Sequence, residues 1–263
     1  MKLGIIGDIH EDILRLKEAF HMLDRQGCDE VACLGDIAGF SIPSFGHFES
    51  RDASACLELV RRNCRYIVAG NHDLFPARRI PSFTAGFNYP GNWYELDHAD
   101  RRKLAGETVW LNEENELDTL LSADEKAFIR TLPEYLVVEA GSERILLSHY
   151  LYPDLSGSTR KYYEAFGPVE DHLDFIEQNQ CRYGFSGHKH IEGVYIADRS
   201  SLLHHDFGSH RLGKQTHWIV GPCIANGKKK NGCMIFDTET FILKVISLGT
   251  PTRVMQVADY KGT

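Results

Sequence analysis

The sequence contains 263 residues, of which 43% are hydrophobic and 25% are charged, a composition typical of a globular protein with a sizeable core. Its formal net charge of −8 argues against non-specific nucleic-acid binding, which depends on lysines and arginines that neutralise phosphates. The sequence lacks the run of roughly 18 consecutive apolar residues that a membrane-spanning helix requires. We therefore expect a protein that does not span a membrane.

The N-terminus and the cysteines bear on the cellular compartment. The first residues, MKLGIIGDIHED, turn acidic after a short apolar run and predict a strand rather than a secretory signal. The seven cysteines form an odd set without Cys-x-x-Cys spacing, which favours reduced, buried thiols over disulfides or a structural zinc site. These features predict a cytoplasmic location.

Residues 1–75 alternate short apolar runs with amphipathic stretches. Apolar runs that end at a glycine predict buried strands, and apolar side chains at helical spacing predict helices. The expected order is a strand at 3–6, a helix at 12–26, a strand at 31–34, a helix at 52–62 and a strand at 66–69. This alternation implies parallel strands with right-handed crossovers, and sites in such sheets lie at the carboxyl ends of the strands.

Residues 76–121 interrupt this order and are rich in Pro, Gly, Asn, Tyr and Trp. We interpret them as a cap-like insertion in a single domain that spans residues 1–263. Ser122 and Glu125 then form a capping-box pattern, which predicts a helix that ends before Pro133.

The remaining elements are shorter, and they are expected at 136–139, 144–147, 169–178 (a helix), 182–186, 194–197, 218–220, 234–236 and 241–246. The last third predicts a second, mostly antiparallel sheet packed on the first. The fold class is therefore α/β.

Five polar blocks follow apolar runs at the ends of predicted strands: Gly7-Asp8-Ile9-His10, Gly35-Asp36, Gly70-Asn71-His72-Asp73, Ser148-His149 and Gly187-His188-Lys189-His190. Where extended backbone continues, residues two apart point the same way. Asp8 with His10, and His188 with His190, would then each converge on one ion. The glycines would let the chain turn sharply and approach a ligand closely.

The side chains of these blocks have the chemistry of a mixed oxygen–nitrogen metal site. Carboxylates, an amide and imidazoles without a thiolate suit Mn, Fe, Zn or Co better than Ca or a structural Zn. Alone, a Gly-Asp is usually a turn and a histidine usually a satisfied side chain, but their joint occurrence at strand ends favours a metal site. The ligand set exceeds the needs of one tetrahedral ion and fits two ions that share a carboxylate: Asp8, His10, Asp36, Asn71, His149, His188 and His190.

These blocks resemble the signature blocks of the calcineurin-like metallophosphoesterases, and their pattern is similar to that of the small bacterial and archaeal phosphodiesterases in the family. The resemblance implies a four-layer α-β-β-α sandwich of two packed mixed sheets flanked by helices. It also implies that Asp36 bridges the two metals and that His72 contacts the phosphate, where it stabilises charge or protonates the leaving group. The first metal would be held by Asp8, His10 and His190, and the second by Asn71, His149 and His188.

Two positions depart from the family pattern. The phosphoprotein phosphatases of the family carry an aspartate three residues after the bridging one, which orients the catalytic histidine, and an arginine follows it; this chain has Gly39 and Phe40 there. The smaller phosphodiesterases often have Gly-Asn after Asp-x-His, where this chain has Glu11-Asp12. The first departure argues against a protein phosphatase, and the second leaves the ligand set intact.

The expected function is hydrolysis of a phosphodiester or phosphomonoester, small or nucleotide-like, by a hydroxide that bridges two divalent metals. The alternatives are a non-catalytic scaffold on the same fold, as in the retromer subunit that resembles these enzymes, and a nuclease similar to the family's DNA-repair members. Metal binding and turnover would distinguish the enzyme from the scaffold, and the acidic net charge argues against the nuclease. The oligomeric state is open.

Candidate substrate-binding residues lie near these blocks. Arg78 and Arg79 could reach an acidic substrate group or be solvated surface arginines, and Tyr150 could stack on a nucleobase or simply pack. The lysine-rich residues 226–232 are most simply a solvated hairpin turn, with substrate or partner contact as the alternative.

Overall fold

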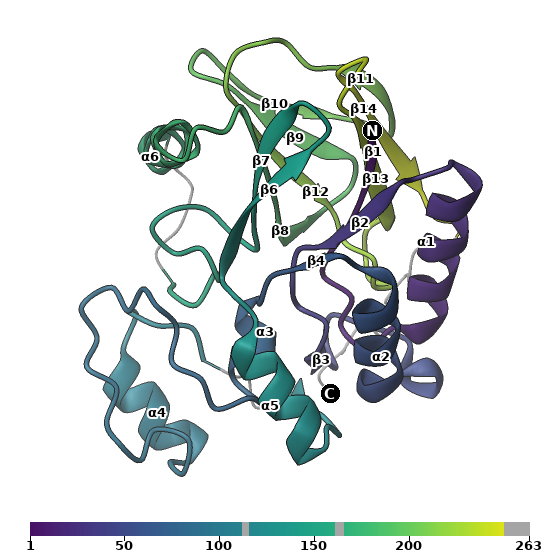
Figure 1. The fold of residues 1–263 in the computed structure, drawn as a ribbon. Coiled ribbons are helices and arrows are strands. Elements are labelled where there is room, and N and C mark those ends of the chain that lie inside the picture. The colour runs from purple at the N-terminus through teal and green to yellow at the C-terminus, as the bar shows by residue number, and fades with distance from the viewer. Residues whose placement is uncertain (112–115, 161–165, 250–263) are drawn as a thin grey trace, which may run out of the picture.

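The computed structural model describes residues 1–111, 116–160 and 166–249, and two six-stranded sheets face each other in it (Figure 1). In the first sheet β1 (Lys2–Ile6) pairs in parallel with β2 (Glu30–Cys33), which pairs in parallel with β4 (Tyr66–Ile67). On the other side of β1 the strands are antiparallel: β13 (Gly232–Asp237), β14 (Ile242–Ser247) and β11 (Gly208–Arg211). The sheet is therefore mixed, and β1 lies where it changes from parallel to antiparallel.

The second sheet is also mixed. At its centre β8 (Tyr183–Ile191) is parallel to both of its neighbours, β7 (Glu143–Ser148) and β12 (His217–Pro222). The outer strands are antiparallel: β6 (Tyr135–Ala140) on one side, and β9 (Val194–Ala197) with β10 (Leu202–His205) on the other.

Helices cover the outer faces of both sheets, so the chain has four layers. Helices α1 (Ile13–Arg25) and α2 (Ala53–Asn63) pack on the first sheet, and α6 (Phe166–Gln178) packs on the second (Figure 1). Because side chains alternate along a strand, Ile5 joins the core between the sheets while Ile6 joins the core under the helices. The expected α-β-β-α sandwich of two mixed sheets is confirmed.

Three predicted helix starts are confirmed by their capping contacts, whereas the helix expected from residue 169 begins at Phe166. The Asp12 carboxylate accepts a hydrogen bond from the Arg15 N–H at the start of α1, and Asp52 begins α2 in the same way. Ser122 begins α5 (Ala123–Thr131) with both hydrogen bonds of a capping box, and α5 ends before Pro133. These contacts satisfy backbone N–H groups that have no partner inside a helix.

The prediction for the last third of the chain was wrong in its pairing. Strands β11, β13 and β14 extend the first sheet, whereas β9, β10 and β12 extend the second. Alternating apolar residues predict a strand but do not identify its neighbour, because strands of both sheets direct apolar side chains into the same core between the sheets. Two of these strands, β10 and β11, were not expected at all.

The described part of residues 76–121 forms a small lobe beside α3 (Asn71–Leu74) and α5 (Figure 1). It contains α4 (His98–Ala105) and its own apolar cluster of Trp93, Ala105, Val109 and Leu111. At its end β5 (Glu116–Leu117) pairs with β3 (Phe40–Ser41), which belongs to the loop after β2, and the 3-10 helix η1 (Phe48–Ser50) follows later in that loop. This arrangement agrees with a cap-like insertion, and we keep that interpretation as a proposal.

Of the helices in the described ranges, none has both the length and the apolar composition needed to cross a membrane.

Candidate metal centre

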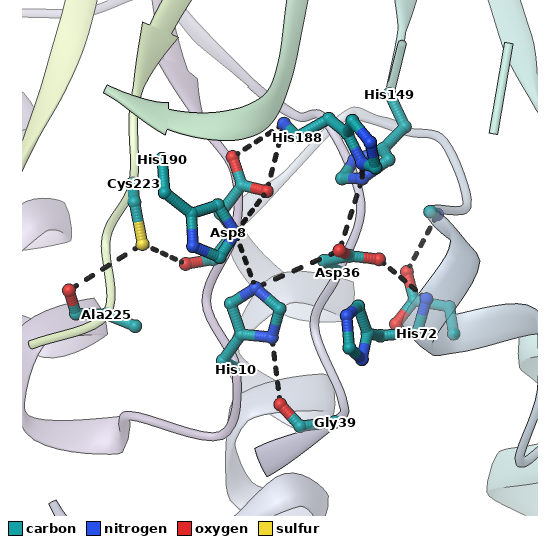
Figure 2. A network of polar contacts seen from close by, with 12 residues as sticks. Asp8, His10, Asp36, Gly39, His72, His149, His188, His190, Cys223 and Ala225 are labelled. Carbon is teal, nitrogen blue, oxygen red and sulfur yellow. Dashed lines mark hydrogen bonds and ion pairs between the residues drawn. The ribbon is translucent and has the colours of Figure 1, made fainter. Parts of the chain in front are cut away.

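The predicted ligands come from strand ends that meet at one edge of the two sheets. Asp8 follows β1, Asp36 follows β2, His149 follows β7, and His188 and His190 lie in the last part of β8. Figure 2 shows these side chains pointing toward one another from segments that are far apart in the sequence. Parallel strands produce this convergence because their carboxyl ends lie at the same edge of the sheet.

Two groups of potential ligands are present, and Asp36 belongs to both of them. In each group the ligand atoms lie within 4.8 Å of one another. Asp36 Oδ2 lies 3.1 Å from His149 Nε2 and 3.8 Å from His10 Nε2. The first group is Asp8, His10, Asp36 and His190, and the second is Asp36, His149 and His188.

The backbone has a left-handed conformation at these positions, in the loops after β1 and β2 and also within the last part of β8. Asp8, His10 and Asp36 have φ angles of 52°, 44° and 51°, and His188 and His190 have 70° and 44°. The expectation that extended backbone makes Asp8 converge with His10, and His188 with His190, on one ion each was therefore wrong: none of the four is extended, and His188 and His190 belong to different groups. Residues other than glycine are rarely left-handed, each costs on the order of 1–3 kcal/mol, and such residues gather at functional sites.

Two glycines leave room for the carboxylates. A Cβ atom at Gly70 would lie 2.1 Å from Asp36 Oδ1, and one at Gly187 would lie 2.5 Å from Asp8 Oδ2. The backbone also orients both acids, because the His188 N–H donates to Asp8 at 3.0 Å and the His72 N–H donates to Asp36 Oδ1 at 2.9 Å.

Backbone carbonyls fix two of the imidazoles. His10 Nδ1 donates to the Gly39 carbonyl at 2.8 Å, and His149 Nδ1 donates to the Leu34 carbonyl at 2.7 Å. A carbonyl can only accept, so each ring carries its proton on Nδ1 and presents Nε2 to the carboxylates. Metal-ligating histidines in proteins are held in this way.

Asn71 fits the same interpretation. Its Oδ1 atom is buried and has no hydrogen-bond partner among the described residues. Buried polar atoms are almost always satisfied, and an amide oxygen is an ordinary ligand for a divalent cation. The donor set therefore fits a metal at this position.

The electrostatics also favour a cation. Burial alone would raise the pKa of Asp36, but the imidazoles of His149 and His72 outweigh it and hold the pKa well below its usual range. Burial disfavours a charged His149, yet Asp36 outweighs burial and raises the pKa of His149 to about 9. The buried carboxylates of Asp8 and Asp36 thus create a field that attracts positive charge.

His72 lies beside the two ligand groups and has an acidic partner that the sequence did not reveal. Its Nδ1 atom lies 3.0 Å from Oε1 of Glu116, whose side chain is 5% exposed. Burial would lower the pKa of His72, but Glu116 and Asp36 together raise it to about 9. The indole of Trp110 contacts the same ring at a centroid distance of 4.5 Å, so the insertion contributes two contacts to His72.

Glu116 contacts the nitrogen that a side chain at residue 39 would reach, the position at which the family's protein phosphatases carry an aspartate and this chain has Gly39. A Cβ atom at Gly39 would lie 2.5 Å from His72 Nδ1, so a side chain at that position would meet the same nitrogen. The only signal in the sequence was the absence of a carboxylate at residue 39 together with an acidic run near the end of the insertion.

The residues at the second departure, Glu11 and Asp12, support the loops around the site. Glu11 has a φ of 66°, a conformation that favours glycine, and its buried carboxylate accepts from the Gly39 N–H at 3.0 Å and pairs with Arg51. Asp12, besides capping α1, accepts from the Asn226 N–H at 3.0 Å. Glu11 thus orients Gly39, whose carbonyl accepts the hydrogen bond from His10 Nδ1.

The predicted substrate-binding residues have different surroundings. Arg78 pairs with Glu95 at 2.7 Å and lines a cavity of about 520 Å³ that also contains His72 and Glu116. Arg79 pairs with Glu134 at 3.0 Å. Tyr150 is 1% exposed and packs on His188 at a centroid distance of 4.3 Å. Arg78 therefore borders the cavity next to His72, whereas Arg79 pairs with an acid elsewhere and Tyr150 packs on a predicted ligand; their roles in substrate binding stay predictions.

Comparisons with known proteins identify the family of this chain. The model of the calcineurin-like phosphoesterase superfamily domain matches residues 1–240, and the chain belongs to this superfamily. An uncharacterized protein from Methanocaldococcus jannaschii is 22% identical over 259 residues, which cover 93% of this chain and 86% of that protein. The resemblance found in the sequence is confirmed.

Two solved structures share the fold. A metallophosphoesterase from Sphaerobacter thermophilus has a TM-score of 0.63 at 17% identity, with 96% of this chain and 90% of that chain covered. A hypothetical protein from Pyrococcus horikoshii has a TM-score of 0.56 at 14% identity, with 94% and 87% covered. At these identities the likeness shows the fold and leaves the substrate open.

Proposed function

We propose that this chain is a metal-dependent phosphoesterase that hydrolyses a phosphodiester or phosphomonoester of small or nucleotide-like size. The main support is the pair of ligand groups that share the buried Asp36 carboxylate, beside an imidazole that belongs to neither group. A scaffold would not need a buried carboxylate between imidazoles or an unsatisfied Asn71 oxygen.

The proposal assigns Asp36 to both metals. The further ligands would be Asp8, His10 and His190 for the first, and Asn71, His149 and His188 for the second. When bound, two divalent transition-metal ions (Mn, Fe, Zn or Co) would neutralise charge on the phosphoryl group and allow a water molecule to be deprotonated near neutral pH.

His72 would act on the leaving group. Its Nδ1 faces Glu116, so Nε2 is the atom available to a substrate, and a carboxylate partner favours the protonated ring. A protonated Nε2 can stabilise the charge on the departing oxygen or donate its proton to it. The large cavity that borders His72 would accommodate that leaving group, with Arg78 at its wall.

Asp36→Asn tests the proposal. This variant keeps the size of the side chain and removes its charge, and we expect both metal content and hydrolysis of bis-p-nitrophenyl phosphate to fall to background. Asp124→Asn, at an exposed position in the first turn of α5, is the control and should match the unchanged protein. Normal turnover by the Asp36→Asn variant with metal bound would show the assignment to be wrong.

The same assay separates the alternatives. Two equivalents of metal with turnover support the phosphoesterase, whereas no metal and no turnover support a scaffold. Cleavage of DNA in preference to small esters would favour a nuclease. Monoesters, diesters, cyclic nucleotides and dinucleoside polyphosphates, each tested with Mn, Fe, Co and Zn, would define the substrate and the metal.

A further inference from the structure

The lysine-rich loop between β12 and β13 lies beside the metal centre, on the His190 side. Residues 228–230 of this loop line a second cavity of about 170 Å³ together with His190 and Phe45. His190 therefore borders the small cavity, whereas His72 borders the large one. The roles proposed above use neither the small cavity nor its lysines.

Hydrogen bonds hold this loop to the first ligand block. The Ile224 N–H donates to the Gly7 carbonyl at 3.1 Å, and the Ala225 N–H donates to the Asp8 carbonyl at 3.1 Å. The Cys223 thiol donates to the same Asp8 carbonyl, as Figure 2 shows. Because the start of the loop bonds to the backbone of a predicted ligand, its lysines are held at a fixed side of the site.

The loop concentrates positive charge in a chain whose formal net charge is −8. Lys230 pairs with Glu192 at 3.2 Å. In the described ranges no ion pair involves Lys228 or Lys229, and both side chains are exposed. Two ammonium groups at the cavity are thus available to an anion.

Apart from Ser44 and His190, the side chains on the rest of the cavity wall are apolar. Phe45 is 2% exposed and stacks on His10 at a centroid distance of 4.6 Å, and Ile191, Cys223 and Ala225 line the same space. An apolar wall with a cationic rim suits an organic body that carries an anionic group. Lysine is a common binder of phosphate, which it contacts as a point charge.

We propose that this cavity is a subsite for a second phosphate group, carried by the part of the substrate that stays on the scissile phosphorus. The inference rests on the proposed phosphoesterase function and defines its substrate class as a diester that bears a further phosphate. The leaving group would lie toward His72, and the retained arm would pass His190 and reach Lys228 and Lys229.

A matched pair of substrates tests this subsite. Thymidine 5′-(p-nitrophenyl phosphate) and its 3′-phosphorylated form share the scissile ester and differ by one phosphate. We expect the additional phosphate to raise kcat/KM by about tenfold, as for two solvent-screened ionic contacts. Lys228→Gln combined with Lys229→Gln should reduce that ratio to near one and leave turnover of the plain ester unchanged, and Glu at both positions should reverse the preference.

The control removes two other positive charges. Lys17→Gln with Lys103→Gln, at exposed positions of α1 and α4, should keep the tenfold ratio. A ratio near one in the unchanged protein, or a ratio unaffected by the Lys228 and Lys229 changes, would overturn the subsite. Failure to hydrolyse either ester would instead contradict the proposed function. In that event the affinities of the metal-loaded protein for thymidine 5′-phosphate and thymidine 3′,5′-bisphosphate still decide the subsite, since equal values refute it.

Discussion

Replacement of Glu116 by glutamine is expected to impair catalysis without removing the metals. The change keeps the shape of the side chain and removes the charge that lies 3.0 Å from His72 Nδ1. Both side chains are largely buried, at 15% and 5% exposure for His72 and Glu116, so water screens the pair only weakly. Loss of the charge from this largely buried ion pair is expected to decrease kcat by about 10- to 100-fold, which corresponds to about 1.4–2.7 kcal/mol.

The leaving group should determine how large this decrease is. An alkyl phosphodiester needs its departing oxygen protonated, whereas p-nitrophenolate leaves without a proton, so Glu116→Gln should slow the alkyl ester more. Glu116→Asp should restore part of the rate. Asp118→Asn removes a charge from the same cavity and should have little effect. Equal losses for both esters, or a change in KM alone, would refute the role assigned to the Glu116–His72 pair.

Three further changes test other parts of the structure. Burial lowers the pKa of His172 to about 3, so below pH 6.5 the unfolded chain takes up a proton that the fold excludes, and stability is lost as pH falls toward 3. We therefore expect the free energy of unfolding, measured with urea on metal-free protein, to fall between pH 6.5 and 5 by about 2 kcal/mol more in the unchanged protein than in the His172→Asn variant. Equal decreases in the two proteins would contradict the assignment. Glu11→Gln leaves the guanidinium of Arg51 without its acidic partner and should lower the unfolding free energy by about 3 kcal/mol, whereas an unchanged urea midpoint would show that the pair is not stabilising. Gly70→Ala places a Cβ atom 2.1 Å from an oxygen of Asp36 and should abolish binding of one or both proposed metals, while Gly91→Ala, with open space around it, should bind metal normally. Equal metal content in the two variants would contradict the proposed geometry.

Much of the fold could be predicted because its signals are local. The Ser122 capping box and the apolar run that forms β1 depend on residues a few positions apart, and the structure has both. The neighbour of β13 could not be predicted, because pairing with β1 joins residues more than 200 positions apart and leaves no periodic trace in either strand.

In the candidate site, too, local features could be predicted and long-range contacts could not. Ligand types at strand ends were visible in the sequence, since chemistry and topology both restrict them. The left-handed backbone at Asp8 and Asp36 could not be predicted from the sequence, because it is imposed by hydrogen bonds between the two loops, such as the one from the Asp8 N–H to the Gly35 carbonyl. The contact between Glu116 and His72 was also invisible, since it depends on how the insertion folds back onto β3.

The central claim is that Asp36 lies between two metal ions. Anomalous diffraction from crystals grown with Mn or Zn tests it most directly, because each bound ion gives a peak at its own position. The proposal predicts two peaks, one beside Asp8, His10 and His190 and one beside Asn71, His149 and His188, with the Asp36 carboxylate contacting both. A single peak, or two peaks that do not share Asp36, would contradict it.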